Sequence, residues 1–453
     1  MSALVASPAA SGSGSLDPVR ALQHALYRAA KADPGRRFHA LHDKVLRRDV
    51  VWRAWVQVRR NSGAAGIDRV TLDMVEQYGV SRLVDELIAD LKDGRWRPLP
   101  ERRVFIPKPG TTEQRPLSIP AVRDRIVQAA LKIVLEPIFE ADFLPCSFGF
   151  RPKRAAHDAL QVLVDESFRG LRWVVETDIA NCFEAIPHEK LMQAVEERVC
   201  DQGVLKLLRA TLRAGVMVDG SVRRAVTGTP QGGVISPLLA NVYLHRVDRA
   251  WRGSYGTLVR YADDLVVMCR SRGQAQAALA RLTVLLADLG LEPKAAKTQI
   301  VCLTEGGEGF DFLGFHHRWV STRAVHTARR ITFLARWPSR KATQHARDRV
   351  RDLTARSRLA VPVERVVQDV NLFLRGWAGY FRYGNSARDF DKIMIYADQR
   401  MALFVGKRHK RGRRFGQVML IRSGNRMGLI NLNGAVVAPR PNRAWRAPAE
   451  HRR

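Results

Sequence analysis

The chain has 453 residues, of which 46% are hydrophobic, so it is long enough for about three domains with full apolar cores. This excludes a disordered chain and a small disulfide-stabilised protein. Lysine and arginine number 75 against 44 aspartates and glutamates, and the net charge of +31 is typical of proteins that bind a polyanion. Residues 316–453 alone hold 31 basic and 8 acidic side chains. We therefore predict a nucleic-acid-binding protein whose last third makes the most phosphate contacts.

Cysteine usage and hydropathy indicate the compartment. The five cysteines show neither a CxxC pair nor the Cys/His spacing of a zinc site, a pattern typical of buried thiols in a reducing environment. No apolar run reaches the roughly 18 residues that a membrane span needs. The sequence thus predicts a cytoplasmic protein that has no membrane partner.

The first predicted elements are mostly helical. Residues 1–15 are small and polar without a period, and we interpret them as a disordered leader. Helical spacing then dominates to about residue 92. The proline-rich stretch 96–120 predicts two extended segments joined by a turn. This hairpin would present Lys108 and Arg115, two cations suited to a triphosphate.

Short strands with carboxylates at their ends are predicted in the middle of the chain. Asp178 ends an apolar strand at 173–178. Two further apolar strands, at 257–261 and 265–269, are separated only by a short turn that contains Asp263 and Asp264. Strands, hairpins and helices alternate irregularly, so we favour an α+β fold with an antiparallel sheet over a doubly wound parallel one.

Helical spacing returns in the last part of the chain. After Trp319 the pattern is basic, and one predicted helix carries a stripe formed by Val363, Val366, Val370, Leu374 and Trp377. This predicts a helical bundle that follows the sheet. Trp377, Tyr380 and Phe381 suit either core packing or stacking on RNA bases, and the sequence leaves both interpretations open.

The three carboxylates suit phosphoryl transfer with two divalent ions. Such a site needs its carboxylates on rigid neighbouring strands, because a flexible loop would not keep the ions about 4 Å apart. The alternative is that the paired aspartates are ordinary turn residues and that Asp178 caps a helix. A glycine-rich segment, TGTPQGG at 227–233, favours the catalytic interpretation. Its glycines let the backbone approach a base pair, and Gln231 can form a hydrogen bond without adding charge.

Taken in order, these segments resemble the reverse transcriptase/maturase family encoded by bacterial group II introns. The resemblance covers about residues 60–410 and is carried by RPLSIP at 115, SFGFRPKRAAHDAL at 147, ETDIANCFEAIPH at 176, GTPQGGVISPLLANVYL at 228, YADD at 261, LGLEPKAAKT at 289 and FDFLGF at 310. It implies a right-hand polymerase, with fingers and palm at 16–315, a helical thumb or maturase domain at 316–405 and a basic tail at 406–453. An N-terminal extension of the fingers would occupy about residues 40–95, where Gly63, Ala65 and Gly66 match the family.

The resemblance also implies the site. Asp178, Asp263 and Asp264 would form the catalytic triad, with Asp178, Asp263 and the Ile179 carbonyl as ligands of Mg²⁺. Lys108 and Arg115 would bind the nucleotide triphosphate. Phe183 would exclude a ribose 2′-hydroxyl, so that dNTPs are preferred, although a core aromatic at this position is the alternative. The remaining implied contacts are Gln231 and Lys297 with the nucleotide, and Gly232, Leu313 and Gly314 with primer and template.

The implied function is an RNA-dependent DNA polymerase that also binds group II intron RNA to assist splicing and mobility. Its partners would be the intron RNA, an RNA template with a DNA primer or target DNA, and dNTPs. The alternatives are a non-catalytic RNA-folding cofactor and a domesticated reverse transcriptase that serves phage defence or CRISPR adaptation.

The last part of the chain departs from many members of the family. No cysteine follows Cys302, so we expect no HNH endonuclease. The tail instead holds a basic cluster that a solvated surface could tolerate but that, with the charge surplus, favours phosphate contact and DNA binding. We define the basic cluster as Lys407, Arg408, Lys410, Arg411, Arg413 and Arg414.

Overall fold

The computed structural model describes residues 17–107, 114–218, 221–223, 227–229, 232–323, 330–424 and 426–437. The predicted leader at 1–15 lies outside these ranges, as do Lys108 and Gln231. Among the described residues, no helix is both long enough and apolar enough to cross a membrane.

The chain forms two compact units whose segments alternate along the sequence. Unit 1 consists of Met1–Val104, Pro116–Leu144 and Phe183–Arg246, and unit 2 of Phe105–Arg115, Pro145–Cys182 and Val247–Arg453. The boundary expected at 315/316 falls inside strand β10 (Phe315–Arg323) of unit 2, and the one at 405/406 inside helix α15 (Ala387–Arg408).

Unit 1 is built around helix α6 (Val122–Glu140), which is buried on nearly every side. Its buried residues include the charged Asp124 and Arg125 beside many apolar side chains, and α1 and α3 both pack on it. The other helices of the unit are shorter and mostly amphipathic. Besides α6, the α-helices that lie wholly within unit 1 in the described ranges are α1 (Pro18–Ala32), α2 (His42–Val45), α3 (Arg48–Arg60), α4 (Leu72–Tyr78), α5 (Val80–Lys92), α9 (His188–Glu196) and α10 (Gln202–Arg213).

A four-stranded sheet carries the predicted proline-rich hairpin. Its order is β2-β1-β4-β5, with β1 at Glu101–Pro107, β2 at Gln114–Ile119, β4 at Val216–Val218 and β5 at Ser221–Arg223. The two extended segments that the sequence predicts are therefore neighbouring strands. The register of Glu101 opposite Val216 makes β1 and β4 a parallel pair, so this sheet is mixed.

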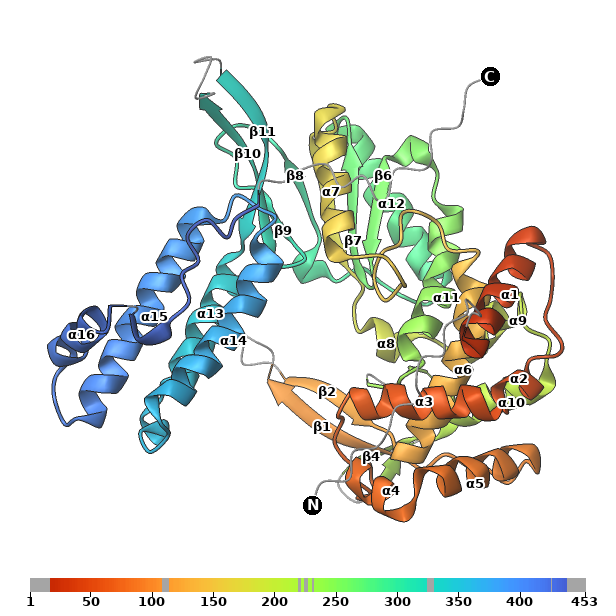
Figure 1. Ribbon diagram of the computed structural model, residues 1–453. Coiled ribbons are helices and arrows are strands. Elements are labelled where there is room, and N and C mark those ends of the chain that lie inside the picture. The colour runs from red at the N-terminus through yellow and green to blue at the C-terminus, as the bar shows by residue number, and fades with distance from the viewer. Residues whose placement is uncertain are drawn as a thin grey trace. The chain divides into compact units, whose positions relative to one another are not determined.

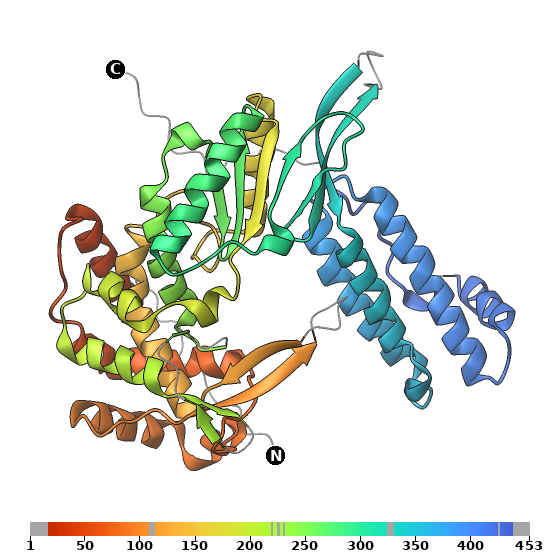
Figure 2. The same cartoon turned by 180° about the vertical axis from the view of Figure 1, so that it is seen from behind.

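The central sheet of unit 2 is fully antiparallel, in the order β6-β7-β3-β8. Figures 1 and 2 show α7 (Ala156–Phe168) on one side of this sheet and α12 (Arg272–Asp288) on the other. Helix α11 (Ser236–Ala250) leads into the sheet, and its last residues belong to unit 2. The strands are β3 (Trp173–Asp178), β6 (Thr257–Tyr261), β7 (Asp264–Cys269) and β8 (Gln299–Cys302).

The C-terminal part of unit 2 is a sheet followed by helices. Strands β9 (Phe310–Phe312), β10 and β11 (Arg330–Pro338) form an antiparallel sheet. The predicted stripe lies on α14, where Val366, Val370, Leu374 and Trp377 are buried. Phe381 is buried as well, so the structure favours core packing over stacking for these rings. The helices are α13 (Arg340–Leu353), α14 (Val363–Phe381), α15 and α16 (Arg413–Arg422).

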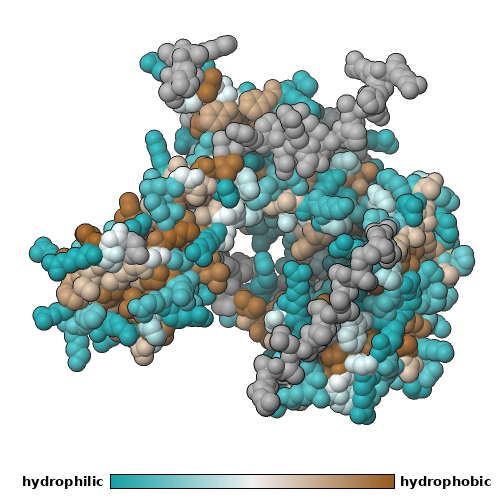
Figure 3. Space-filling view, in the orientation of Figure 1, coloured by the Kyte–Doolittle hydropathy of each residue, from teal (hydrophilic) through white to brown (hydrophobic). Residues whose placement is uncertain are grey.

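The C-terminal helices also expose apolar side chains. Figure 3 shows hydrophobic residues gathered over this region, at the left of the view. Leu372 and Ile421 are 72% and 78% exposed.

The structure confirms the α+β class with antiparallel sheets and a helical C-terminal region. It qualifies the interpretation of the cysteines. Cys182 and Cys269 are buried, whereas Cys146, Cys200 and Cys302 are only partly covered, and all five are free thiols.

Candidate active site

Two of the three carboxylates lie side by side on neighbouring strands of the central sheet of unit 2. The register pairs Asp178, the last residue of β3, with Asp264, the first residue of β7. Directly opposite residues of an antiparallel pair point to the same face, so both carboxylates lie on one side. The sequence predicted that Asp264 lies in the turn. The structure instead places it in the strand, where the ladder fixes its direction.

Asp263 lies in the two-residue turn between β6 and β7. Tyr261 pairs with Asp264, which leaves Ala262 and Asp263 to reverse the chain. Ala262 has a φ of 58°, a left-handed conformation that the flanking ladder must hold against its preference. The Ile179 amide donates to the Asp263 carbonyl at 3.2 Å, which ties the turn to the chain just beyond Asp178. Ile179, proposed from its family position as a carbonyl ligand, thus lies next to the turn.

Lys297 provides the positive charge nearest to Asp178. Its Nζ lies 2.6 Å from Asp178 Oδ2 and 3.6 Å from Asp264 Oδ1. Burial lowers the pKa of Lys297, but the hydrogen bond to Asp178 and the charges of the three aspartates outweigh this effect and leave the pKa raised. The family position predicted contact with a nucleotide, and in this structure Lys297 binds a carboxylate instead.

Asp263 and Asp264 are held in an environment that disfavours their charge. Burial, together with the neighbouring Asp178, raises the pKa of Asp263, and the positive charges of Lys297 and Arg115 oppose the rise. Burial also raises the pKa of Asp264 to about 6. Within the described ranges, no three His, Cys, Asp or Glu side chains converge into a group that could hold a metal ion.

A buried arginine, which the sequence did not single out, holds the turn between β6 and β7. Arg260 is fully buried in β6, and its guanidinium forms a bidentate ion pair with Asp248 of α11, at 2.8 and 2.5 Å. The same guanidinium donates to the Ala262 carbonyl at 3.1 Å and to Ser147 Oγ at 2.8 Å. The only signal in the sequence is an arginine inside the apolar strand TLVRY.

The SFGF segment completes this support. The Phe148 amide donates to the Arg260 carbonyl at 2.9 Å, and the Arg260 amide donates to the Cys146 carbonyl at 2.8 Å. A Cβ on Gly149 would lie 2.4 Å from the Ala262 nitrogen, so only glycine lets the two backbones approach this closely. The turn that carries Asp263 is thus held by the Arg260 guanidinium and by the close approach of the Gly149 backbone.

The turn implied at the primer terminus is held by α14. Leu313 and Gly314 connect β9 to β10 with φ values of 48° and 78°, the conformation of a tight hairpin turn. The Tyr380 hydroxyl donates to the Leu313 carbonyl at 2.9 Å, and the Ser339 amide donates to the Gly314 carbonyl at 2.9 Å. Tyr380 therefore positions this turn.

The implied nucleotide residues are divided between the units. Arg115 is exposed in β2 and belongs to unit 2. Phe183 lies half-buried in the short helix α8 (Cys182–Ala185), and Gly232 follows in unit 1 with a φ of 116°. Gly232 approaches β2 so closely that a Cβ would lie 2.3 Å from the Ser118 carbonyl oxygen. In this structure Gly232 thus serves a close contact between backbones.

The segment that resembles the N-terminal extension is anchored by arginines. Arg102 donates to the Ala65 carbonyl at 2.7 Å, and Arg125 donates to the Ala64 carbonyl at 2.6 Å. A Cβ on Gly66 would lie 2.6 Å from the Ala121 Cα. These contacts give the glycine at 66 a packing role, whether or not the segment also contacts RNA.

The basic cluster is exposed at the end of α15 and the start of α16. Five of its six side chains extend from the surface and form no hydrogen bond or ion pair with the described part of the chain. Arg408 differs, because its Nη1 donates to the Leu359 and Val361 carbonyls, both at 2.6 Å. Arg408 therefore holds the preceding loop, in addition to any phosphate contact.

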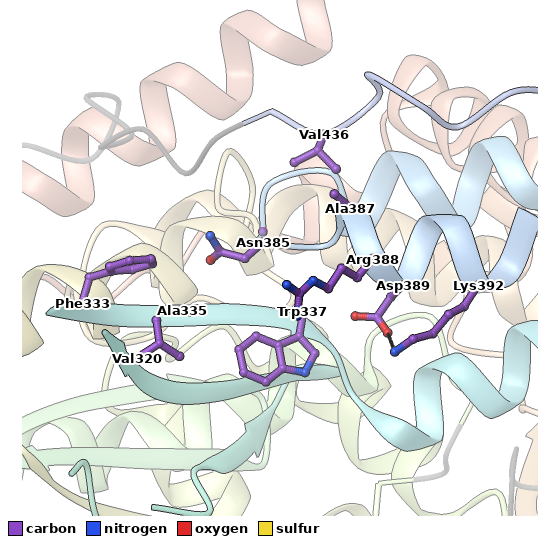
Figure 4. Close-up of a pocket in the computed structure, with 11 residues that line it drawn as sticks. Val320, Phe333, Ala335, Trp337, Asn385, Ala387, Arg388, Asp389, Lys392 and Val436 are labelled. Atoms are coloured by element: carbon purple, nitrogen blue, oxygen red, sulfur yellow. Dashed lines mark hydrogen bonds and ion pairs between the residues drawn. The ribbon is translucent and has the colours of Figure 1, made fainter. Parts of the chain in front are cut away.

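A cavity of about 810 Å³ lies between the base of the β10–β11 hairpin and the start of α15. Figure 4 shows Trp337 and Phe333 on the strand side and Arg388, Asp389 and Lys392 on the helix side. None of the residues that the sequence singled out lines this cavity. It is therefore separate from the carboxylate group.

Comparison with known proteins supports a polymerase assignment for this sheet. The family model for reverse transcriptase (RNA-dependent DNA polymerase) matches residues 106–317, and that for the group II intron maturase-specific domain matches residues 343–420. An antiparallel sheet with carboxylates at its β3 and β6–β7 ends is thus the palm of a nucleic acid polymerase.

Three curated proteins are similar to parts of this chain. The group II intron-encoded protein LtrA of Lactococcus lactis subsp. cremoris is 38% identical over 212 residues, which are 47% of this chain and 35% of LtrA. The protein YkfC of Escherichia coli strain K12 is 36% identical over 323 residues, 63% of this chain and 82% of YkfC. An uncharacterized 91 kDa protein in the cob intron of Schizosaccharomyces pombe is 39% identical over 209 residues, 46% of this chain and 25% of that protein.

The chain belongs to the family of group II intron reverse transcriptases and maturases. It spans about a third of the length of LtrA. Members of the reverse transcriptase family generally use divalent metal ions for nucleotidyl transfer.

Proposed function

We propose that the chain is an RNA-dependent DNA polymerase that copies RNA into cDNA and also binds group II intron RNA to assist splicing and mobility. The observation that carries the proposal is the pairing of Asp178 with Asp264 beside the Asp263 turn, inside the matched reverse transcriptase domain. The maturase-specific match at 343–420 supports the intron RNA as partner. It also favours an intron-encoded enzyme over a reverse transcriptase of phage defence.

The donor set fits Mg²⁺. Carboxylate oxygens are the ligands that Mg²⁺ prefers, and a divalent cation would offset both the burial and the nearby Asp178 charge that raise the pKa of Asp263. Asp178 and Asp263 would hold the ions, assisted by the Ile179 carbonyl. When bound, the ions would activate the primer 3′-oxygen and stabilise the pyrophosphate that leaves.

The chain's own groups provide geometry rather than acid or base catalysis. The ladder between β3 and β7 fixes the direction of Asp178 and Asp264. The Arg260 guanidinium holds the turn that carries Asp263. Lys297 neutralises part of the acidic charge through its contact with Asp178, and it would also bind a nucleotide phosphate. Arg115 would bind the triphosphate, and Leu313 and Gly314 would support the primer terminus.

The test is primer extension on an RNA template with dNTPs and Mg²⁺, comparing the unaltered protein with Asp263→Asn. We expect the variant to lose at least about 100-fold in rate, because an amide keeps the shape but loses the charge that holds a cation. RNA affinity and assisted splicing should stay near the unaltered values. Extension by the variant at the unaltered rate would exclude the metal assignment.

The same assay separates the alternative functions. An unaltered protein that assists splicing of intron RNA but never extends a primer would be a non-catalytic RNA-folding cofactor. A protein that extends primers but neither binds nor splices intron RNA would fit a domesticated reverse transcriptase. The expected result is activity in both assays.

A further inference from the structure

A clasp of backbone hydrogen bonds joins two segments of unit 1 that are about 40 residues apart. The Thr229 amide donates to the Phe183 carbonyl at 2.6 Å, and the Gly228 amide donates to the Ile186 carbonyl at 2.8 Å. Thr227 and Pro187 form an isolated antiparallel bridge beside these bonds. Residues 183–187 are therefore held by residues 227–229 through main-chain contacts.

One side chain closes this clasp. His188, the first residue of α9, places its Nε2 2.7 Å from the Gly228 carbonyl oxygen. A carbonyl can only accept, so Nε2 is the donor and carries a proton. His188 is partly exposed, and within the described part of the chain its ring is the only side chain that donates a hydrogen bond to Gly228.

Gly228 has no room for a side chain at the clasp. Its φ is 98°, and a Cβ there would lie 3.1 Å from the Glu184 carbonyl oxygen and 3.2 Å from the Glu184 Cα. The glycine thus lets the segment that follows Phe183 lie directly against residues 227–229. Without the His188 bond, the Gly228 carbonyl would lose the only side-chain donor that the structure gives it.

The segment that clasps Phe183 is itself anchored further along the chain. The Val234 amide donates to Gln128 Oε1 at 2.8 Å, and Gly232 lies against the Ser118 carbonyl. Glu184, next to Phe183, lies 3.5 Å from Arg103 of β1. The backbone of Phe183 is therefore tied to α6 and to the β1–β2 sheet, rather than to a free loop.

We propose that His188 is a positioning residue that fixes Phe183 as the side chain that discriminates deoxyribose from ribose. The inference rests on the proposed polymerase function. Steric exclusion of one hydroxyl group requires the ring to be held within a fraction of an ångström, because a ring that can retreat admits the larger sugar. His188 holds the Gly228 end of the clasp whose other end is bonded to the Phe183 carbonyl.

The test compares two amide substitutions that differ in reach. His188→Gln places an N–H donor near the position of the histidine Nε2, whereas His188→Asn is one carbon shorter and does not reach the Gly228 carbonyl. The measured quantity is the ratio of kcat/KM for a dNTP to that for the matching rNTP in primer extension. We expect the ratio to fall roughly 3- to 10-fold in His188→Asn, the effect of one lost hydrogen bond, and to stay near the unaltered value in His188→Gln.

The ratio distinguishes positioning from a general structural role, since a partly unfolded enzyme loses both activities equally. Glu189→Ala, an exposed change at the next position of α9, is the matched control and should leave the ratio unchanged. If His188→Asn does not fold, Gly228→Ala perturbs the same clasp and should lower the ratio in the same direction.

The outcomes distinguish a failure of the proposed polymerase function from a failure of the proposed role of His188. An unaltered protein that incorporates no dNTP would overturn the polymerase function and this inference together. Normal dNTP incorporation with the same ratio in the unaltered protein, His188→Asn and Gly228→Ala would overturn the role of His188 alone. Equal loss in the Asn and Gln variants would do the same, because it would show that the donor is not what matters.

Discussion

The carboxylate turn and the basic cluster are both polar regions of unit 2, but they are built in opposite ways. The turn that carries Asp263 lies against a guanidinium and a carboxylate that are fully buried, Arg260 and Asp248. The basic cluster lies at helix ends, and its side chains are exposed. Metal ions and a reacting phosphate require fixed geometry, whereas a polyanion is attracted by charge over several ångströms. The difference indicates that single substitutions should have large effects at the turn and small, additive effects at the cluster.

The largest effect is expected at the buried ion pair. Asp248→Leu should destabilise the protein by about 3 to 5 kcal/mol, because it leaves the Arg260 guanidinium buried without a countercharge. The double variant Asp248→Leu/Arg260→Met should regain much of this stability, because neither charge remains. Urea unfolding of the single and double variants measures both values. An equally unstable double variant would contradict this interpretation of the pair.

The double variant also tests the role of Arg260 at the turn. It removes the donor to the Ala262 carbonyl, so primer extension should remain slow even where folding is restored. Full recovery of both stability and rate would show that the pair stabilises the fold without positioning the carboxylates.

Phe183 is intermediate in burial between the buried ion pair and the exposed basic cluster, and its backbone is bonded to Thr229. Phe183→Val should lower the preference for dNTP over rNTP by roughly 10-fold or more, because steric exclusion of a small group is worth about 1 to 3 kcal/mol. The ratio of the two kcat/KM values is the measurement, with urea unfolding as the control for lost ring volume. An unchanged ratio in a folded variant would assign the ring to the core instead.

A smaller effect is expected from pH. The pKa of Asp264 in the folded protein is about 6, above its ordinary value of 3.8, so the folded state binds more protons than the unfolded chain between these values. Its ionisation therefore lowers stability as the pH rises through this window. Asp264→Asn should be more stable than the unaltered protein at about pH 8 and lose this advantage near pH 3.

Thermal unfolding without divalent ions at the two pH values measures this difference. The carboxylate side chain is 40% exposed, so solvent screening limits the gain to less than about 2 kcal/mol. Primer extension should move in the opposite direction and decline as the pH falls through about 6, because protonated Asp264 cannot support a cation. A stability difference that is independent of pH would contradict the raised pKa.

The smallest effect for each residue is expected at the basic cluster. Replacing Lys407, Lys410, Arg411, Arg413 and Arg414 by glutamine should weaken nucleic-acid binding without changing nucleotide addition on a saturating primer-template. If about half of these five cations contact phosphates, the slope of log K against log salt should become shallower by about 2. Filter binding at several salt concentrations measures the slope for intron RNA and for DNA. An unchanged slope for both would indicate a solvated surface.

Arg408 differs from the rest of the basic cluster, because its side chain is bonded to the backbone. Because it donates to the Leu359 and Val361 carbonyls, Arg408→Gln should cost about 1 kcal/mol of stability, unlike its neighbours. Equal stability of Arg408→Gln and Lys407→Gln in urea unfolding would show that these hydrogen bonds do not contribute in solution.

Much of the fold could be predicted from local patterns. An apolar run that ends in aspartate predicted β3, and two apolar runs on either side of a short aspartate-containing turn predicted the β6–β7 hairpin. The stripe of valine, leucine and tryptophan predicted the buried face of α14. Ordered motifs predicted the family, which the matches to both domains confirm. These patterns can be read because strand and helix periods depend on residues only a few positions apart.

The tertiary structure alone decided which distant groups meet. In the sequence Arg260 is an ordinary strand residue and His188 only starts a helix, whereas in the structure Arg260 bonds to Asp248 and Ser147 and His188 donates a hydrogen bond to the Gly228 carbonyl. The sequence left Trp377 open between core and RNA, and burial placed it in the core. Such contacts depend on chain segments that are tens of residues apart, and periodicity carries no information about which of them pack together. The sequence by itself therefore determined the elements and the family, and the fold determined which side chains hold the reactive ones in place.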